Sequence, residues 1–175
     1  MVYVDSYPKT AKLVRSQFIV AFVALGIGAL FGIIQALHRT DVFRGFVSSA
    51  DYYTILTGHG VLLVLVFTTF FIAGLFAWGV SNSLERELPQ RTAWAAFWLM
   101  LVGTVLATVA ILGGVMGAPN ILGQQLSADV LFTFYAPMQA HPFFYVGAAL
   151  LIVGSWIAGL AYFQSLWRWR EDNPD

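Results

Sequence analysis

The chain has 175 residues, of which 59% are hydrophobic and only 10% carry a formal charge. Soluble domains have about 25% charged residues, so this composition excludes a soluble globular protein and indicates an integral membrane protein. The nine basic and nine acidic residues cancel, which argues against nucleic-acid binding, and the lack of cysteine excludes disulfides and thiolate-ligated metal centres within this sequence.

Four uncharged, apolar stretches are each long enough to cross a bilayer. A hydrocarbon core of about 30 Å needs about 20 apolar residues in a helix. The four stretches are 18–37, 53–80, 93–116 and 142–167. They are too long for strands, so we predict an all-α membrane segment of four helices that forms a single domain.

Small and weakly polar residues inside these stretches predict how the helices meet. In lipid, glycine lets two helix backbones approach closely. We therefore expect helix contacts at Gly26, Gly28, Gly32, Gly103 and Gly154. The hydroxyls of the threonines within the stretches, such as Thr68 and Thr104, are expected to bond to backbone carbonyls of their own helix.

The placement of the basic residues predicts the orientation of the helices. Seven basic residues lie at one end of the predicted bundle: Lys9, Lys12, Arg15, Arg86, Arg91, Arg168 and Arg170. The other end has only Arg39 and Arg44. By the positive-inside rule, both termini are expected on the cytoplasmic side.

The connection 117–140 is long for a loop and contains one charged residue, Asp129. Its second half is apolar and aromatic. We expect it either to pack against the outer mouth of the bundle or to lie at the level of the lipid headgroups.

Among the three histidines, His59 is the strongest candidate for a metal ligand. It lies between Gly58 and Gly60 in the second apolar stretch, about two turns, or roughly 9 Å, from the outer end. Ionisable residues at membrane depth are costly and usually functional, and imidazole is the commonest metal ligand among side chains. Glycines on both sides suggest a flat, bulky cofactor such as haem packed against the helix. The alternative is a neutral imidazole hydrogen-bonded to a serine or threonine of another helix.

The other two histidines have simpler interpretations. His38 ends the first predicted helix and is expected to cap its last carbonyls. His141 precedes Pro142, a residue that favours the first turn of a helix, so His141 is expected at the outer end of the fourth helix.

A series of short motifs runs through nearly the whole chain. They are Phe31-Gly32, Gln35-Ala36-Leu37, Tyr52-Tyr53, Leu56, His59-Gly60-Val61-Leu62, Val66-Phe67-Thr68, Leu131, Thr133-Phe134-Tyr135, Pro137, His141, Phe144-Tyr145, Gly147, Trp167 and Asn173-Pro174. In this order they resemble the N-terminal part of subunit I of the haem–copper terminal oxidases, most closely the B-family with its ba-type enzymes.

The resemblance implies a site and a setting. It implies that His59 is an axial ligand of the low-spin haem iron, and that the four helices are the first of a bundle of at least twelve. The second axial ligand, the copper-ligating histidines and the high-spin haem ligand belong to later helices of the family. Copper and the high-spin haem are therefore expected only in the complete subunit, and this chain alone is expected to be inactive.

The resemblance also implies an activity and partners. The parent protein would reduce dioxygen to water with coupled proton pumping, in the plasma membrane of a prokaryote. The expected partners are the remainder of subunit I, a copper-bearing subunit II, a small electron-donor protein and membrane lipid. Nucleic acid is not expected to bind.

Two other functions are consistent with the residues. One is a self-contained four-helix membrane cytochrome of the b type, in which His59 and His141 are the two ligands of one haem. The other is a membrane anchor or assembly subunit without haem, which only packs against its partners.

Overall fold

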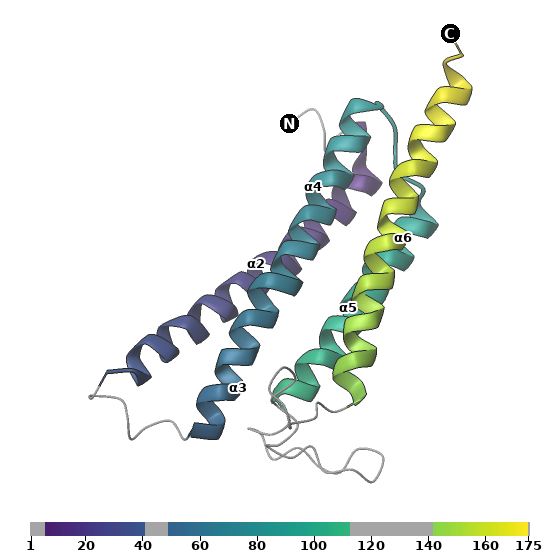
Figure 1. Cartoon of the computed structure of the whole chain (residues 1–175). Helices are drawn as coiled ribbons and strands as arrows, with labels where there is room; N and C mark the ends of the chain where they lie inside the picture. Colours follow the sequence, from purple (N-terminus) through teal and green to yellow (C-terminus); the bar gives the residue numbers. More distant parts are fainter. Residues whose placement is uncertain (1–5, 41–48, 113–141, 175) are drawn as a thin grey trace.

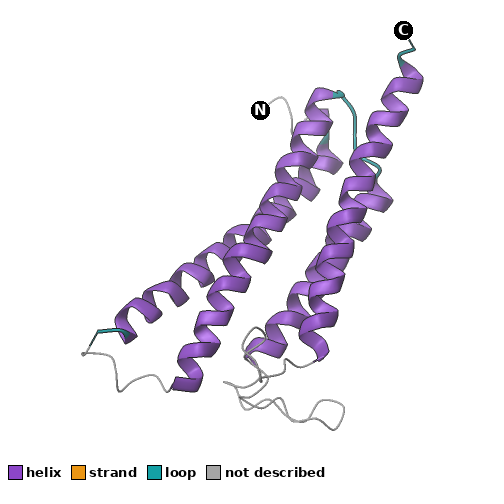
Figure 2. Cartoon of the chain, in the orientation of Figure 1, coloured by secondary structure: helices purple, strands orange, loops and turns teal. Residues whose placement is uncertain are grey.

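A computed structural model describes residues 6–40, 49–112 and 142–174, and every regular element in them is a helix (Figure 2). Four helical segments are long and apolar enough to cross a membrane, which confirms the predicted all-α membrane fold. The elements in chain order are α2 (Pro8–His38), α3 (Ser49–Gly60), η1 (Val61–Phe67), α4 (Thr68–Ser83), α5 (Gln90–Leu112) and α6 (Pro142–Asp172). The elements α3, η1 and α4 follow one another without a break and form the second span.

The first and last helices extend beyond the apolar stretches of the sequence. α2 begins at Pro8, where proline is favoured because the first helical N–H needs no partner, and α6 continues to Asp172. Polar and charged residues therefore prolong both helices past the apolar length that crosses a bilayer. Residues 113–116 of the third predicted stretch and the connection 117–140 lie outside the described residues.

The helices pack as two pairs. α2 lies along the second span, and α5 lies along α6. The start of α2, the link between α4 and α5, and the end of α6 lie at the same end of the bundle (Figure 1). The seven basic residues counted above lie at or near this end, for which a cytoplasmic location remains a prediction from the sequence.

Four of the five predicted glycine contacts are found. A Cβ placed on Gly28 would lie 2.6 Å from the Leu63 side chain, and three more positions would each bring a Cβ within 3.0 Å of a neighbouring heavy atom: Gly32, Gly103 and Gly154. The prediction for Gly26 is wrong, because nothing lies within 4 Å of a Cβ placed there. A helix that is apolar all round gives no sequence signal for which face meets a neighbour.

The centre of the second span is a π-helix. The element η1 covers Val61–Phe67 and begins two residues after His59. Such helices are rare, occur mostly as single-turn bulges and are frequent at functional sites. A π-turn contains more residues than an α-turn. The element η1 therefore shifts the side chains of α4 around the helix axis, relative to the face that carries His59. The run of aliphatic residues gave no indication of it.

A carboxylate from the link between α4 and α5 caps the start of α2. The N-cap residue, Tyr7, makes no side-chain capping bond. Instead, Glu87 accepts the backbone N–H of Lys9 at 2.9 Å and that of Thr10 at 2.7 Å. The link turns at Glu85, which has a φ of 49°, a conformation uncommon for residues other than glycine.

Candidate functional site

His59 lies in the last turn of α3 with its imidazole turned toward α2. The side chain is half-buried, and its Nδ1 lies 2.7 Å from the carbonyl oxygen of Gly28. A carbonyl can only accept a hydrogen bond, so Nδ1 carries the proton and donates. In the tautomer with its proton on Nδ1, the ring has its lone pair on Nε2, which makes no hydrogen bond within the described residues.

The sequence left open a hydrogen bond from His59 to a serine or threonine of another helix. His59 Nδ1 does not make such a bond. The partner is a backbone carbonyl, which no side-chain pattern reveals. Gly28 and Gly32, four residues apart, line the same face of α2 and oppose the second span. The sequence identified both glycines as packing positions. Their spacing opposite an intramembrane histidine is the one signal that could have linked them to the site.

The two glycines beside His59 differ in their surroundings. A Cβ on Gly58 would lie 2.8 Å from the ring of Phe31 in α2, so the absence of a side chain there serves helix packing. A Cβ on Gly60 would meet nothing within 4 Å. The space beside Gly58 is thus taken by Phe31, and only the side at Gly60 is open, where a cofactor stays a prediction.

The remaining histidines are not brought to His59 by the described contacts. His38 ends α2 as expected, but the predicted cap on the last carbonyls is wrong. Its ring packs on Tyr52 with centroids 4.7 Å apart, and its buried Nδ1 has no hydrogen-bond partner among the described residues. The cap is made instead by the backbone N–H of Arg39. His141 lies outside the described residues.

The sequence matches a known family over most of its length. Residues 12–175 fit the family described as cytochrome c and quinol oxidase polypeptide I. The chain belongs to this family. The resemblance found in the motifs is thereby confirmed for subunit I as a class.

Two proteins are similar to this chain over almost all of its length. Cytochrome c oxidase subunit 1 of Thermus thermophilus is 31% identical over 179 residues, which cover 97% of this chain and 29% of the relative. In a structure of a heme–copper terminal oxidase dimer, one chain matches with a TM-score of 0.77 and 32% identity, over 94% of this chain and 27% of that chain. This chain thus spans less than a third of the length of either relative.

Metal-ligating side chains are sparse in the described part of this oxidase polypeptide I chain. Residues 6–40, 49–112 and 142–174 contain no group of three or more histidine, cysteine, aspartate or glutamate side chains that could hold a metal ion. Within these described residues, His59 therefore does not belong to a cluster of three such side chains.

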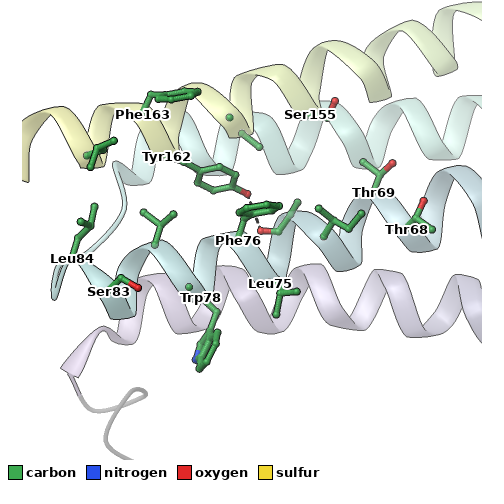
Figure 3. A pocket seen from close by; sticks show the side chains of 17 residues that line it. Thr68, Thr69, Leu75, Phe76, Trp78, Ser83, Leu84, Ser155, Tyr162 and Phe163 are labelled. Atoms are coloured by element: carbon green, nitrogen blue, oxygen red, sulfur yellow. Dashed lines mark hydrogen bonds between the residues drawn. The ribbon is translucent and has the colours of Figure 1, made fainter.

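A second feature of this oxidase chain is a cavity of about 930 Å³ between α4 and α6. Its lining is mainly apolar and includes Phe76, Phe163 and Leu166, with the Tyr162 ring crossing between the helices (Figure 3). No residue of α3 lines it, so it is separate from His59. The Tyr162 hydroxyl donates a hydrogen bond of 2.8 Å to the carbonyl of Ala73.

Replacing Tyr162 with phenylalanine is expected to destabilise the contact between α4 and α6 by about 1 kcal/mol, the usual worth of an interhelical hydrogen bond in a membrane protein. Thermal unfolding of the purified complex in detergent measures the change. Tyr145→Phe, in the same helix but on an exposed ring, is the matched control and should leave the midpoint unchanged. If the two variants unfold at the same midpoint, the hydrogen bond to the Ala73 carbonyl does not contribute measurably to stability.

Proposed function

We propose that this chain is the N-terminal part of subunit I of a respiratory terminal oxidase of the B-family, and that His59 supplies one axial ligand of the low-spin haem. The observation that carries the proposal is the hydrogen bond from Nδ1 to the Gly28 carbonyl, because it leaves the Nε2 lone pair for the iron. Metal-bound imidazoles usually donate their other N–H in this way. The open side at Gly60 is compatible with a flat group against the helix.

The residues present fit half of a haem site. His59 would hold the iron through Nε2, while Gly28 fixes the tautomer and the direction of the ring. When bound, the haem supplies a one-electron carrier. The remaining ligands are proposed to come from other parts of the complete subunit, in line with the share of the Thermus relative that the chain covers.

The proposed activity of the whole protein is reduction of dioxygen to water with coupled proton pumping, in the plasma membrane of a prokaryote. The names of the relatives, a cytochrome c oxidase subunit and a heme–copper oxidase, support it. Partners would be the rest of subunit I, a small electron-donor protein and a copper-bearing subunit II. The sequence has no cysteine for a thiolate-ligated copper centre of its own.

The test compares three alanine variants, His59→Ala, His141→Ala and His38→Ala, in the complete complex purified from membranes. Reduced-minus-oxidised absorption spectra report the low-spin haem. We expect His59→Ala to lose essentially all of the low-spin signal, because the iron loses a ligand, and the other two variants to keep it.

Each contrary outcome identifies one of the alternative functions. Loss of the signal in His141→Ala as well as in His59→Ala would indicate a self-contained cytochrome with paired ligands. A full low-spin signal in His59→Ala would refute the ligand assignment and favour an anchor subunit without haem.

A further inference from the structure

We propose that Gly32 is a positioning residue for the His59 imidazole, and that the ring packs directly against the Gly32 backbone because this residue has no side chain. The inference rests on the proposed function, since it concerns how the ligand is held. The three atoms nearest to a Cβ placed on Gly32 all belong to His59: Cε1 at 2.9 Å, Nδ1 at 3.2 Å and Nε2 at 3.8 Å. The Cε1 edge of the ring therefore occupies the place that a side chain at this position would take.

The ring cannot easily give way. It is joined to its backbone by only two side-chain torsions, and Nδ1 is fixed by the 2.7 Å bond to the Gly28 carbonyl. A methyl group on Gly32 would come closer to Cε1 than real Cβ contacts allow. The imidazole would have to rotate or withdraw from α2, and either movement breaks or weakens the bond to Gly28.

Gly32 also keeps the Gly28 carbonyl accessible. In a regular α-helix this carbonyl accepts the N–H of Gly32, four residues later, and its oxygen lies at the level of Gly32. A carbonyl oxygen has two lone pairs, so the second is free for His59 Nδ1. A Cβ at position 32 would lie only 3.2 Å from this Nδ1, whereas glycine lets the ring approach the oxygen without such a close contact.

The consequence concerns the electronic properties of the ligand. A histidine that donates its Nδ1 proton to an acceptor is a more basic ligand through Nε2, and its ring plane is fixed. Hydrogen bonding around the ligands is one of the ways in which a protein sets the reduction potential of a haem. Gly32 would thus help to set both the orientation of the ring plane and the potential of the low-spin haem.

The test uses Gly32→Ala in the complete complex, with two matched controls. Gly26→Ala changes the same helix where nothing lies within 4 Å of the new Cβ. Gly74→Ala causes a comparable clash between α4 and α2, 2.9 Å from the ring of Phe18, away from His59. The readouts are the midpoint potential of the low-spin haem and the g-values of its oxidised form by electron paramagnetic resonance.

We expect Gly32→Ala to shift the potential to more positive values and to change the g-values, because a less basic, rotated imidazole stabilises the oxidised iron less. Both controls should keep the parent values. Loss of the low-spin haem in Gly32→Ala but not in Gly74→Ala also supports the proposal, since the crowding then acts through the ring.

Three results would overturn it: parent-like potential and g-values in Gly32→Ala, equal shifts in Gly32→Ala and Gly74→Ala, or loss of haem from both. The last two would show that general helix packing is responsible. Failure of the proposed function is distinguishable, because it appears as a low-spin haem that survives in His59→Ala.

Discussion

Alanine in place of Gly103 or Gly147 is expected to force α5 and α6 apart. A Cβ on Gly103 would lie 2.5 Å from the carbonyl oxygen of Gly147 and 2.8 Å from the backbone nitrogen of Leu151. A Cβ on Gly147 would lie 2.5 Å from the carbonyl oxygen of Gly103 and 2.7 Å from the nitrogen of Ala107. These neighbours are backbone atoms, which cannot rotate away as a flexible side chain can. Relief of the clash therefore requires the two helices to separate.

The expected cost is about 1–3 kcal/mol for each variant, as for other overpacked contacts, even after the gain in helix propensity. Helix separation also weakens the dispersion contacts that hold helices together in lipid. Thermal or denaturant unfolding of the purified complex measures the change. Gly159→Ala is the matched control, because a Cβ there meets nothing within 4 Å in the same helix. It should stabilise α6 by up to about 1 kcal/mol.

The double variant adds a sharper criterion. Once the first alanine has moved the helices apart, the second meets a wider gap, so the combined loss should be smaller than the sum of the single losses. A Gly147→Ala protein that unfolds at the same midpoint as Gly159→Ala would contradict the close crossing of α5 and α6.

The sequence predicted the membrane-spanning helices well because hydropathy reports directly on transfer of side chains into lipid. It predicted the pairing of these helices less well. Residues 18–34 of α2 are apolar on all sides, so Gly26 and Gly28 look alike in the sequence although only Gly28 meets the second span. Contacts of this kind depend on helix rotation, which amino-acid pattern alone does not set when every face is apolar.

The candidate site was likewise predicted only in part. The position of His59 in the second span followed from its cost at membrane depth. Its partner could not be predicted, because backbone carbonyls carry no sequence signal. The threonines also divide: Thr68 bonds to the carbonyl of Val64 as expected, whereas the buried hydroxyl of Thr104 has no partner among the described residues.

The capping of α2 by Glu87 was also beyond sequence rules, since those rules search for a capping side chain within a few residues of the helix start. Glu87 is 77 residues from Thr10 along the chain. Its two oxygens accept the N–H groups of Lys9 and Thr10, and one also accepts the Thr10 hydroxyl at 2.5 Å. Thr10 is fully buried and in turn accepts the N–H of Leu88. The carboxylate therefore joins the start of α2 to the link before α5.

Glu87→Ala is expected to destabilise the complex by about 2–3 kcal/mol. Hydrogen bonds to a charged group each contribute about 1.5–3 kcal/mol, and a negative charge at a helix N-terminus adds about 0.3–1 kcal/mol, though partial exposure and water in the vacated space reduce the sum. Glu87→Gln should recover less than half of the loss, because the amide oxygen can accept but the amide nitrogen is a second donor facing a donor. Unfolding of the complex measures both variants.

The local effect separates a lost cap from a general loss of stability. Backbone amides at the start of α2 should exchange their hydrogens faster in Glu87→Ala, while those in the middle of α2 exchange as in the parent. Glu171→Ala is the control, because among the described residues that exposed carboxylate accepts only the Trp167 indole N–H, and its loss should cause no measurable change.

A double-mutant cycle with Thr10→Val tests whether the two side chains act as one unit. Thr10 provides a donor to Glu87 and an acceptor to Leu88, so each single variant should remove part of the same connection. The loss in the double variant should then fall short of the sum by about 0.5–3 kcal/mol, the range found for residues in one hydrogen-bond network. Additive losses would mean that Glu87 acts on the helix N-terminus alone and that Thr10 does not couple α2 to the link.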